Sequence, residues 1–464
     1  MRLGAQRQRD RVLRAVADRL AATGLLLVGG ASERFGSPKA LAPFRGETLA
    51  ERAWRVLDET CDEVIAVGKE RDGLALPFPV LDDGSADRAP VYGVIAGLRA
   101  AAHQTCVALP VDCPLVTPEL LRELAEAAAV PQTGPLPGVY TKSMLDELES
   151  RIATGELSLR GVNPATLVVD ETRLDNVNTR TELIAAAVAD WARSREDVRA
   201  ALLVGSQARA DTPADRWSDL DIGLFVDDPG ALAADASWLE EFGEPVLTFL
   251  EPTAFGDRVE RRVLYDGGED VDFPLIDAQS WRELASSPES RVVLARGYRV
   301  LYDELGLGAE LEQLKPPADS WPPEPAAFIQ LTNDFWYHAL WTARKLRRGE
   351  VLTALGSLAR LLLDSTVTML RWHAKAVDPS VDTWHGTRFV ERWADAGALA
   401  GLERAFPHYD VRDVARALWE TIDLFQLLEE ETARRLGFEL QLDHADLRRR
   451  VAEVVRDPRQ GATL

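Results

Sequence analysis

"VGSQARADTPADRWSDLDIGLFV", residues 204–226, places two carboxylates, Asp219 and Asp221, two residues apart at the start of an apolar run that ends Ile-Gly-Leu-Phe-Val. Side chains alternate along a strand, so residues two apart point to the same face, where like charges repel. One interpretation is two solvated acids on an edge strand. The other is a metal site, because a divalent cation removes the repulsion and carboxylate oxygens suit Mg²⁺ or Mn²⁺.

Features around this pair favour the metal site. Gly205 lets the backbone turn close to a triphosphate, and Ser206 offers a hydroxyl and an amide to phosphate oxygens. Asp272 lies in the apolar run DVDFPLI, residues 270–276, where it is placed to supply a third carboxylate. We therefore predict phosphoryl or nucleotidyl transfer in this part of the chain.

The order of these motifs resembles the nucleotidyltransferases with a polymerase-β-type core. Within them it is similar to the aminoglycoside 6-adenylyltransferase (streptomycin adenylyltransferase) family, over about residues 181–460. The resemblance implies transfer of AMP from ATP to a hydroxyl of an aminoglycoside, with metal held by Asp219 and Asp221 and catalysis completed by Asp272. The residues that it implies for ATP binding are Gly205, Ser206, Arg209 and Lys345, with Arg388 as a further candidate.

A second motif, LLLVGGASERFGSPKAL, occupies residues 25–41. Gly29 and Gly30 follow an apolar run and allow close approach of the backbone to a nucleoside triphosphate. Arg34 and Lys39 supply positive charge for its phosphates. This combination predicts a second nucleotide site.

The second motif resembles the molybdenum cofactor guanylyltransferase family and its sugar-nucleotidyltransferase relatives, over about residues 22–180. The resemblance implies a metal held by Asp112 and Asn178, with Asp112 also catalytic, and a nucleoside contact from Asp82 or Asp83. It implies GTP as the nucleotide and a phosphorylated acceptor such as molybdopterin; cytidine nucleotides and a sugar phosphate are alternatives. The remaining implied nucleotide-binding residues are Leu27, Gly29, Gly30, Arg34 and Lys39.

The pattern of apolar residues predicts three parts. Strands and helices alternate over residues 1–180, beginning with a helix over 5–20, which predicts a Rossmann-like α/β domain. Residues 181–313 mix strands with helices, and the resemblance implies that they form the polymerase-β-type α+β core. After a proline-rich junction, the pattern over residues 328–460 predicts an all-helical domain, with long helical stretches such as 354–374 and 411–436. The resemblance implies that this domain binds substrate or nucleotide.

Composition limits the possible partners. The 464 residues carry a net charge of −22, and residues 1–180 hold only 21 basic and 25 acidic side chains against 32 and 50 in the remainder. Such an acidic balance disfavours nucleic acid and favours a cationic small molecule. No apolar run approaches the roughly 18 residues of a membrane span, and we expect a cytoplasmic protein with no membrane partner. The three cysteines, lacking a C-x-x-C spacing, are expected to be reduced core thiols.

Two functional hypotheses follow. The first is a bifunctional enzyme with two metal-dependent nucleotidyltransferase sites on unrelated folds. The alternative is that only one half is catalytic and the other binds a nucleotide or ligand as a regulatory module.

Overall fold

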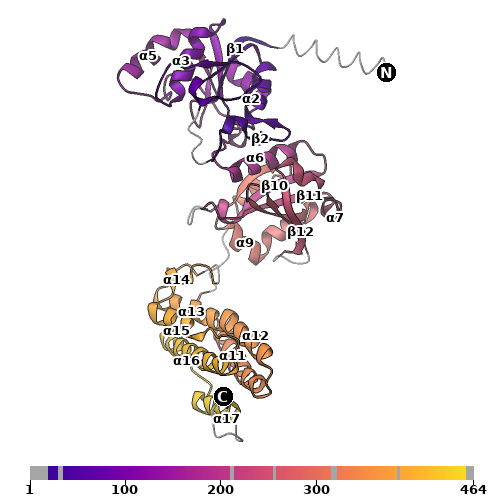
Figure 1. The fold of residues 1–464 in the computed structure, drawn as a ribbon, viewed down its shortest axis with the longest axis vertical. Helices are drawn as coiled ribbons and strands as arrows, with labels where there is room; N and C mark the ends of the chain where they lie inside the picture. The colour runs from indigo at the N-terminus through magenta and orange to yellow at the C-terminus, as the bar shows by residue number, and fades with distance from the viewer. Residues whose placement is uncertain are drawn as a thin grey trace. The chain divides into compact units, whose positions relative to one another are not determined.

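The computed structural model describes residues 19–29, 35–209, 214–253, 258–314, 321–383 and 387–455. It forms two compact units, residues 1–317 and residues 318–464 (Figure 1). Nearly all of the helix predicted over residues 5–20 lies outside the described residues. The predicted division of the first unit at residue 180 stays a prediction.

The N-terminal part of the first unit is built on a five-stranded sheet. Its strands in spatial order are β5 (Val80–Asp82), β4 (Cys61–Gly68), β1 (Leu20–Leu27), β6 (Thr105–Pro110) and β8 (Gly138–Thr141). All neighbours are parallel except β8, which runs antiparallel to β6. The helices between them along the chain are α2 (Leu49–Asp58), α3 (Pro90–Ala100) and α4 (Pro118–Glu126), and α5 (Leu145–Ala153) follows β8. This alternation confirms the α/β prediction, and the three cysteines are buried and free.

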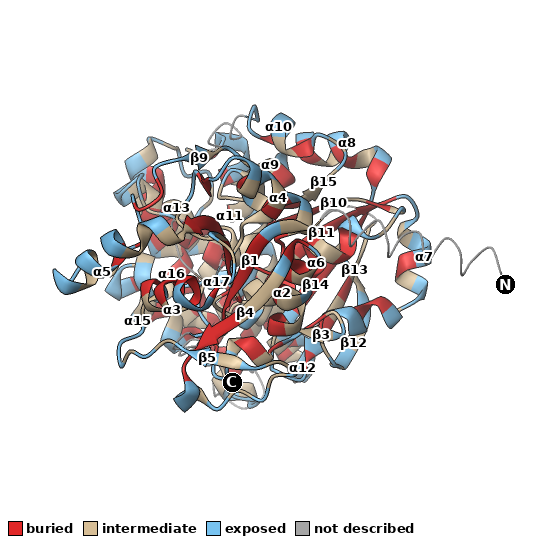
Figure 2. Cartoon of the chain, turned by 90° about the horizontal axis from the view of Figure 1, so that it is seen from above, coloured by how far each residue is buried: buried red, intermediate tan, exposed pale blue. Residues whose placement is uncertain are grey.

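The second sheet has six strands, of mixed direction. In spatial order they are β12 (Pro245–Pro252), β13 (Val259–Tyr265), β14 (Asp270–Asp277), β11 (Leu220–Val226), β10 (Val198–Val204) and β15 (Arg299–Asp303). Only β11 and β14 are parallel to each other. Figure 2 shows buried residues along inner strands of both sheets, such as β1 and β11, whereas the edge strand β12 is exposed or intermediate along its length.

Helices cover both faces of the second sheet. On one face lie α8 (Trp281–Ser286), α9 (Pro288–Leu294) and α10 (Leu307–Leu311), which pack on Leu202 and Phe225. The short helix α7 (Pro229–Ala234) and the long helix α6 (Arg180–Arg193) contribute to the core on the other face.

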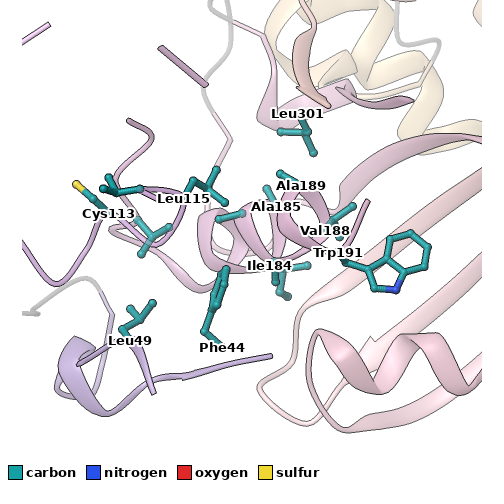
Figure 3. Packing of buried hydrophobic residues seen from close by; sticks show 14 of the residues in the cluster. Phe44, Leu49, Cys113, Leu115, Ile184, Ala185, Val188, Ala189, Trp191 and Leu301 are labelled. Carbon is teal, nitrogen blue, oxygen red and sulfur yellow. The ribbon is translucent and has the colours of Figure 1, made fainter. Parts of the chain in front are cut away.

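Helix α6 belongs to the cores of both sheets. It starts at a capping box in which Thr179 and Glu182 satisfy each other's backbone N–H groups. Its buried side chains, among them Ile184 and Trp191, share one hydrophobic cluster with Leu115 of the first half and Leu301 of the second (Figure 3). Both halves cover this helix, which explains why it is apolar on several sides and not along a single stripe.

Ion pairs reinforce this junction. Asp190 of α6 accepts hydrogen bonds from Arg45 Nη1 and Arg52 Nη2, each at 2.6 Å. Arg45 also donates to Glu241 at 3.1 Å. All three side chains of the Asp190 cluster are at most 21% exposed, so the pairs are only partly screened by water.

The second unit is helical throughout its described residues, as predicted. Its helices are α11 (Pro325–Arg347), α12 (Val351–Arg360), α13 (Val367–Val377), α14 (Val390–Trp393), α15 (Ala396–Ala405), α16 (Val411–Leu436) and α17 (His444–Val455). Its core includes Phe335 stacked on Phe425, with ring centroids 3.6 Å apart. The continuous stretch Val351–Val377 is long and apolar enough to cross a membrane by length and composition alone, a test that core helices of globular proteins also pass.

Candidate active sites

Three carboxylates meet at one end of the second sheet. β11 and β14 are parallel neighbours, and their register places Asp221 beside Asp272. Asp219 immediately precedes β11, two residues before Asp221. One carboxylate oxygen from each of the three lies within 4.8 Å of the other two. The structure thus brings together the three acidic residues that the sequence singled out.

Asp272 has the most unusual environment of the three. Its side chain is 4% exposed, and its Oδ2 accepts a hydrogen bond from Arg262 Nη2 at 2.7 Å. Its Oδ1 is buried and has no hydrogen-bond partner. The pKa of Asp272 is raised to about 7, chiefly by burial, which Arg262 opposes and the nearby Asp221 carboxylate reinforces. An orphaned carboxylate oxygen beside two more carboxylates fits a divalent cation or the proton of a reacting group.

The turn after β10 lies against this cluster. Gly205 has φ +70°, and a Cβ at this position would lie 2.9 Å from Asp221 Cγ. Ser206 Oγ donates to the backbone oxygen of Asp219 at 3.2 Å and lies 3.4 Å from its Oδ1. Glycine is therefore required where the turn passes the carboxylates, and the serine ties the turn to them. Arg209 is the last described residue before the gap at 210–213.

Lys345, a candidate phosphate contact, lies near the end of α11 in the helical unit. Its Nζ donates to Glu350 Oε2 at 2.9 Å and stands 4.9 Å from the ring centroid of Trp341. Its charge is thus already paired within the helical unit. Arg388, the further candidate, is exposed.

A second candidate site lies in the first half, where β1 and β6 end. A cavity of about 630 Å³ is lined by Leu27, Gly29, Lys39 and Asp112, four of the residues predicted for it. Carboxyl ends of parallel strands are where α/β sheets bind ligands. Gly30 and Arg34, also predicted for this site, lie outside the described residues.

Lys39 occupies the place expected for a metal ion. Its Nζ donates to Asn178 Oδ1 at 2.8 Å and to Asp112 Oδ2 at 3.2 Å. These two oxygens are the ligands predicted for the metal, so the ammonium and a divalent cation would compete for them. The two oxygen donors, of which Asp112 lines the cavity, are of the kind that Mg²⁺ prefers, and they fit the ion if the ammonium moves away.

A smaller cavity of about 260 Å³ adjoins Gly29. Asp83 lines it, and its carboxylate is paired with the buried Lys69 at 2.8 Å. Asp82 does not line it; its carboxylate accepts the backbone N–H groups of Glu70 and Gly84, which lower its pKa. Of the two acids considered for the nucleoside, Asp83 is the one at a cavity.

Comparison with known families covers both halves. Residues 178–453 match the family model "Streptomycin adenylyltransferase", and residues 24–163 match "MobA-like NTP transferase domain". The chain belongs to the streptomycin adenylyltransferase family. It also carries a MobA-like NTP transferase domain ahead of the adenylyltransferase region.

Individual relatives are similar to parts of this chain. A "Probable molybdenum cofactor guanylyltransferase" of Pelotomaculum thermopropionicum is 34% identical over 191 residues, which cover 36% of this chain and 93% of the relative. "Aminoglycoside 6-adenylyltransferase" of Bacillus subtilis is 23% identical over 260 residues, which cover 54% of this chain and 88% of the relative. A crystal structure of a Bacillus subtilis aminoglycoside 6-adenyltransferase aligns over 59% of this chain and 98% of its own, with 16% identity and a TM-score of 0.30.

The sequence interpretation missed two charged residues of these sites. In the adenylyltransferase region it did not single out Arg262, although its place on a strand beside the third carboxylate could have suggested a role. In the NTP transferase domain it did not single out Lys69, which pairs with Asp83. A buried lysine after an apolar strand is a signal, because lysine is seldom fully buried without a partner.

Proposed function

We propose that the adenylyltransferase region transfers AMP from ATP to a hydroxyl of an aminoglycoside-like acceptor. The observation that carries the proposal is the cluster of Asp219, Asp221 and Asp272 beside the Gly205 turn. The name of the Bacillus subtilis relative and the 50 acidic against 32 basic side chains after residue 180 support a cationic acceptor.

In this proposal each residue has a separate task. Gly205 and Ser206 receive the triphosphate, and Asp219 and Asp221 hold Mg²⁺ or Mn²⁺. The bound metal would neutralise the charge of the reacting phosphate. Asp272 Oδ1 takes the proton of the acceptor hydroxyl while that oxygen bonds to the α-phosphorus; the bond from the α-phosphorus to the bridging oxygen breaks, and pyrophosphate leaves. A buried carboxylate that is held by one oxygen and has its other oxygen without a hydrogen-bond partner suits acceptance of that proton.

For the NTP transferase domain we propose transfer of a nucleotidyl group from GTP to a phosphorylated acceptor such as molybdopterin. Leu27, Gly29 and Lys39 would contact the nucleotide, and Asp112 with Asn178 would hold the metal. The contact of Lys39 with both metal-site oxygens supports an exchange in which the ammonium moves to phosphate when the metal binds. The name of the Pelotomaculum thermopropionicum relative, a probable molybdenum cofactor guanylyltransferase, supports a guanylyl group as the group transferred and a molybdenum-cofactor acceptor.

The experiment that tests both proposals is a pyrophosphate-release assay on the full-length protein. Each NTP is combined with Mg²⁺ and with streptomycin, related aminoglycosides, molybdopterin or sugar phosphates as acceptor. Asp219→Asn should abolish the ATP–aminoglycoside reaction alone, and Asp112→Ala the GTP reaction alone. Loss of both reactions in either variant would refute two separate sites. Release from one half only, with nucleotide binding at the other, would support the regulatory-module alternative. The whole chain is used because α6 packs on both halves.

A further inference from the structure

Arg262 is held between three carboxylates beside the metal-binding cluster. Its Nη2 donates to Asp272 Oδ2 at 2.7 Å, and its Nε lies 2.8 Å from Glu251 Oε1 and 3.0 Å from Glu260 Oε1. The register of the sheet explains the grouping. Arg262 is opposite Asp272, and Glu260 is opposite Glu251, so these side chains share one face of β12, β13 and β14.

Asp272 is the most buried member of this group. The Glu251 side chain is 39% exposed, Arg262 36%, Glu260 14% and Asp272 4%. Arg262 is therefore anchored at its Nε by two glutamates nearer the solvent, and it presents its Nη2 to the buried acid. Charge-assisted hydrogen bonds of this kind are short and directional, and a guanidinium can serve several carboxylates at once.

We propose that Arg262 is a positioning residue for adenylyl transfer: it ties Asp272 by Oδ2, so that Oδ1 is the oxygen turned toward Asp219 and Asp221. This inference rests on the proposed function. The carboxylate torsion of an aspartate is broad, and without a tie its two oxygens exchange places. Because Oδ2 is bonded and Oδ1 is buried without a partner, the structure selects one oxygen for the reaction.

Substitutions of Arg262 test this role in the full-length protein. Arg262→Lys keeps the positive charge but loses the planar guanidinium, whose separate N–H groups bind Asp272 and the two glutamates. Arg262→Ala removes the charge and the guanidinium. Arg282→Lys is the matched control, because Arg282 forms a similar carboxylate pair with Glu310 at 2.6 Å on an exposed surface of the same unit. Thermal unfolding of each variant identifies any that fail to fold; if Arg262→Ala does not fold, Arg262→Lys decides.

The first readout is steady-state AMP transfer from ATP to streptomycin. Misplacement of a reacting group by about 1 Å costs roughly a hundredfold in rate, so we expect kcat to fall about a hundredfold in Arg262→Ala while the KM for ATP changes less than about threefold. Added guanidinium should restore part of the lost kcat in Arg262→Ala. The Arg282→Lys control should match the unsubstituted protein.

The second readout is Mn²⁺ binding without nucleotide, followed by electron paramagnetic resonance. It is made in an Asp112→Ala background, so that the NTP transferase domain contributes no site. Before the acceptor binds, Asp272 Oδ1 is the third carboxylate oxygen of the cluster and can contribute to holding Mn²⁺. Since Arg262→Lys keeps the charge, weaker Mn²⁺ binding in it would report the lost orientation of Asp272, and we expect a loss of several-fold. Unchanged Mn²⁺ affinity together with unchanged kcat in folded Arg262→Lys would overturn the inference. If the unsubstituted protein transferred AMP to no acceptor, the proposed function would fail, and Mn²⁺ binding would still decide whether Arg262 positions Asp272.

Discussion

Substitution of Gly205 by alanine separates backbone strain from damage to the carboxylate cluster. Gly205 has φ +70°, and an added Cβ would lie 2.9 Å from Asp221 Cγ. A left-handed conformation costs an L-residue about 1–2 kcal/mol, of which about 0.5 kcal/mol is offset by the lower entropy of alanine in the unfolded chain. We expect the free energy of unfolding to fall by about 1 kcal/mol.

The loss of activity should be much larger than the loss of stability. The atoms that the new Cβ meets belong to the Asp221 side chain, which can rotate away, so the fold survives and the carboxylate moves. A displacement of about 1 Å at a reacting centre lowers the rate roughly a hundredfold. We therefore expect Gly205→Ala to release pyrophosphate from ATP with a kcat lower by about two orders of magnitude.

Gly268 offers a matched control in the turn between β13 and β14. Its φ is +89°, and nothing lies within 4 Å of an added Cβ. Gly268→Ala should lose a similar free energy of unfolding and keep its activity. Both variants are measured by denaturant unfolding and by pyrophosphate release from ATP with streptomycin. Equal activities in Gly205→Ala and Gly268→Ala would refute the reasoning that the turn must leave room for Asp221.

Three further predictions concern the junction and the two sites. Asp190→Ala leaves the partly buried Arg45 and Arg52 with fewer acceptors, and we expect it to lower the free energy of unfolding by about 2 kcal/mol in urea; a loss below about 0.5 kcal/mol would contradict the role of this cluster. Lys39→Ala should weaken binding of GTP about tenfold and of guanosine much less, since lysine acts on phosphate as a point charge; calorimetry showing equal losses would place Lys39 away from phosphate. Because the pKa of Asp272 is raised, between pH 4 and 7 this carboxyl group is protonated in the metal-free folded protein and ionised in the unfolded chain. Asp272 therefore makes the free energy of unfolding fall as pH rises through that window. Asp272→Asn should flatten that part of the profile, and an unchanged slope would show that Asp272 does not titrate there.

The D-x-D stretch allowed much of the second site to be predicted, because its decisive contacts are local or follow from strand alternation. Asp219 and Asp221 are two residues apart, and the apolar neighbours of Asp272 marked it as a strand residue. The sequence could not show that β14 is the parallel neighbour of β11, which is what sets Asp272 beside Asp221. Arg262 was missed for the same reason, because its contact with Asp272 depends on β13 being the neighbour of β14.

Predicted helices show a similar contrast. The stretch predicted over 411–436 has the bounds of α16, Val411–Leu436, because its Asp410 cap and the following Gly437 are local signals. The stretch predicted over 354–374 is interrupted by a π-helical segment at Leu361–Thr366. A wider hydrogen-bond register leaves no trace in residue composition, and the periodicity of apolar residues continues through it.

The placement of Asn178 argues that the two halves are joined structurally as well as in sequence. Asn178 Oδ1 accepts from Lys39, 139 residues earlier in the chain, and its backbone N–H donates to Glu182 Oε2 at 2.5 Å. Glu182 also closes the capping box of α6, and α6 is packed against both sheets. The residue predicted to complete the metal site of the NTP transferase domain is thus held by the first turn of a helix from the adenylyltransferase region. A cut after residue 180 would remove Glu182 from Asn178 and expose the apolar sides of α6, so the loss of GTP activity in such a fragment would not distinguish an inactive domain from an incomplete site.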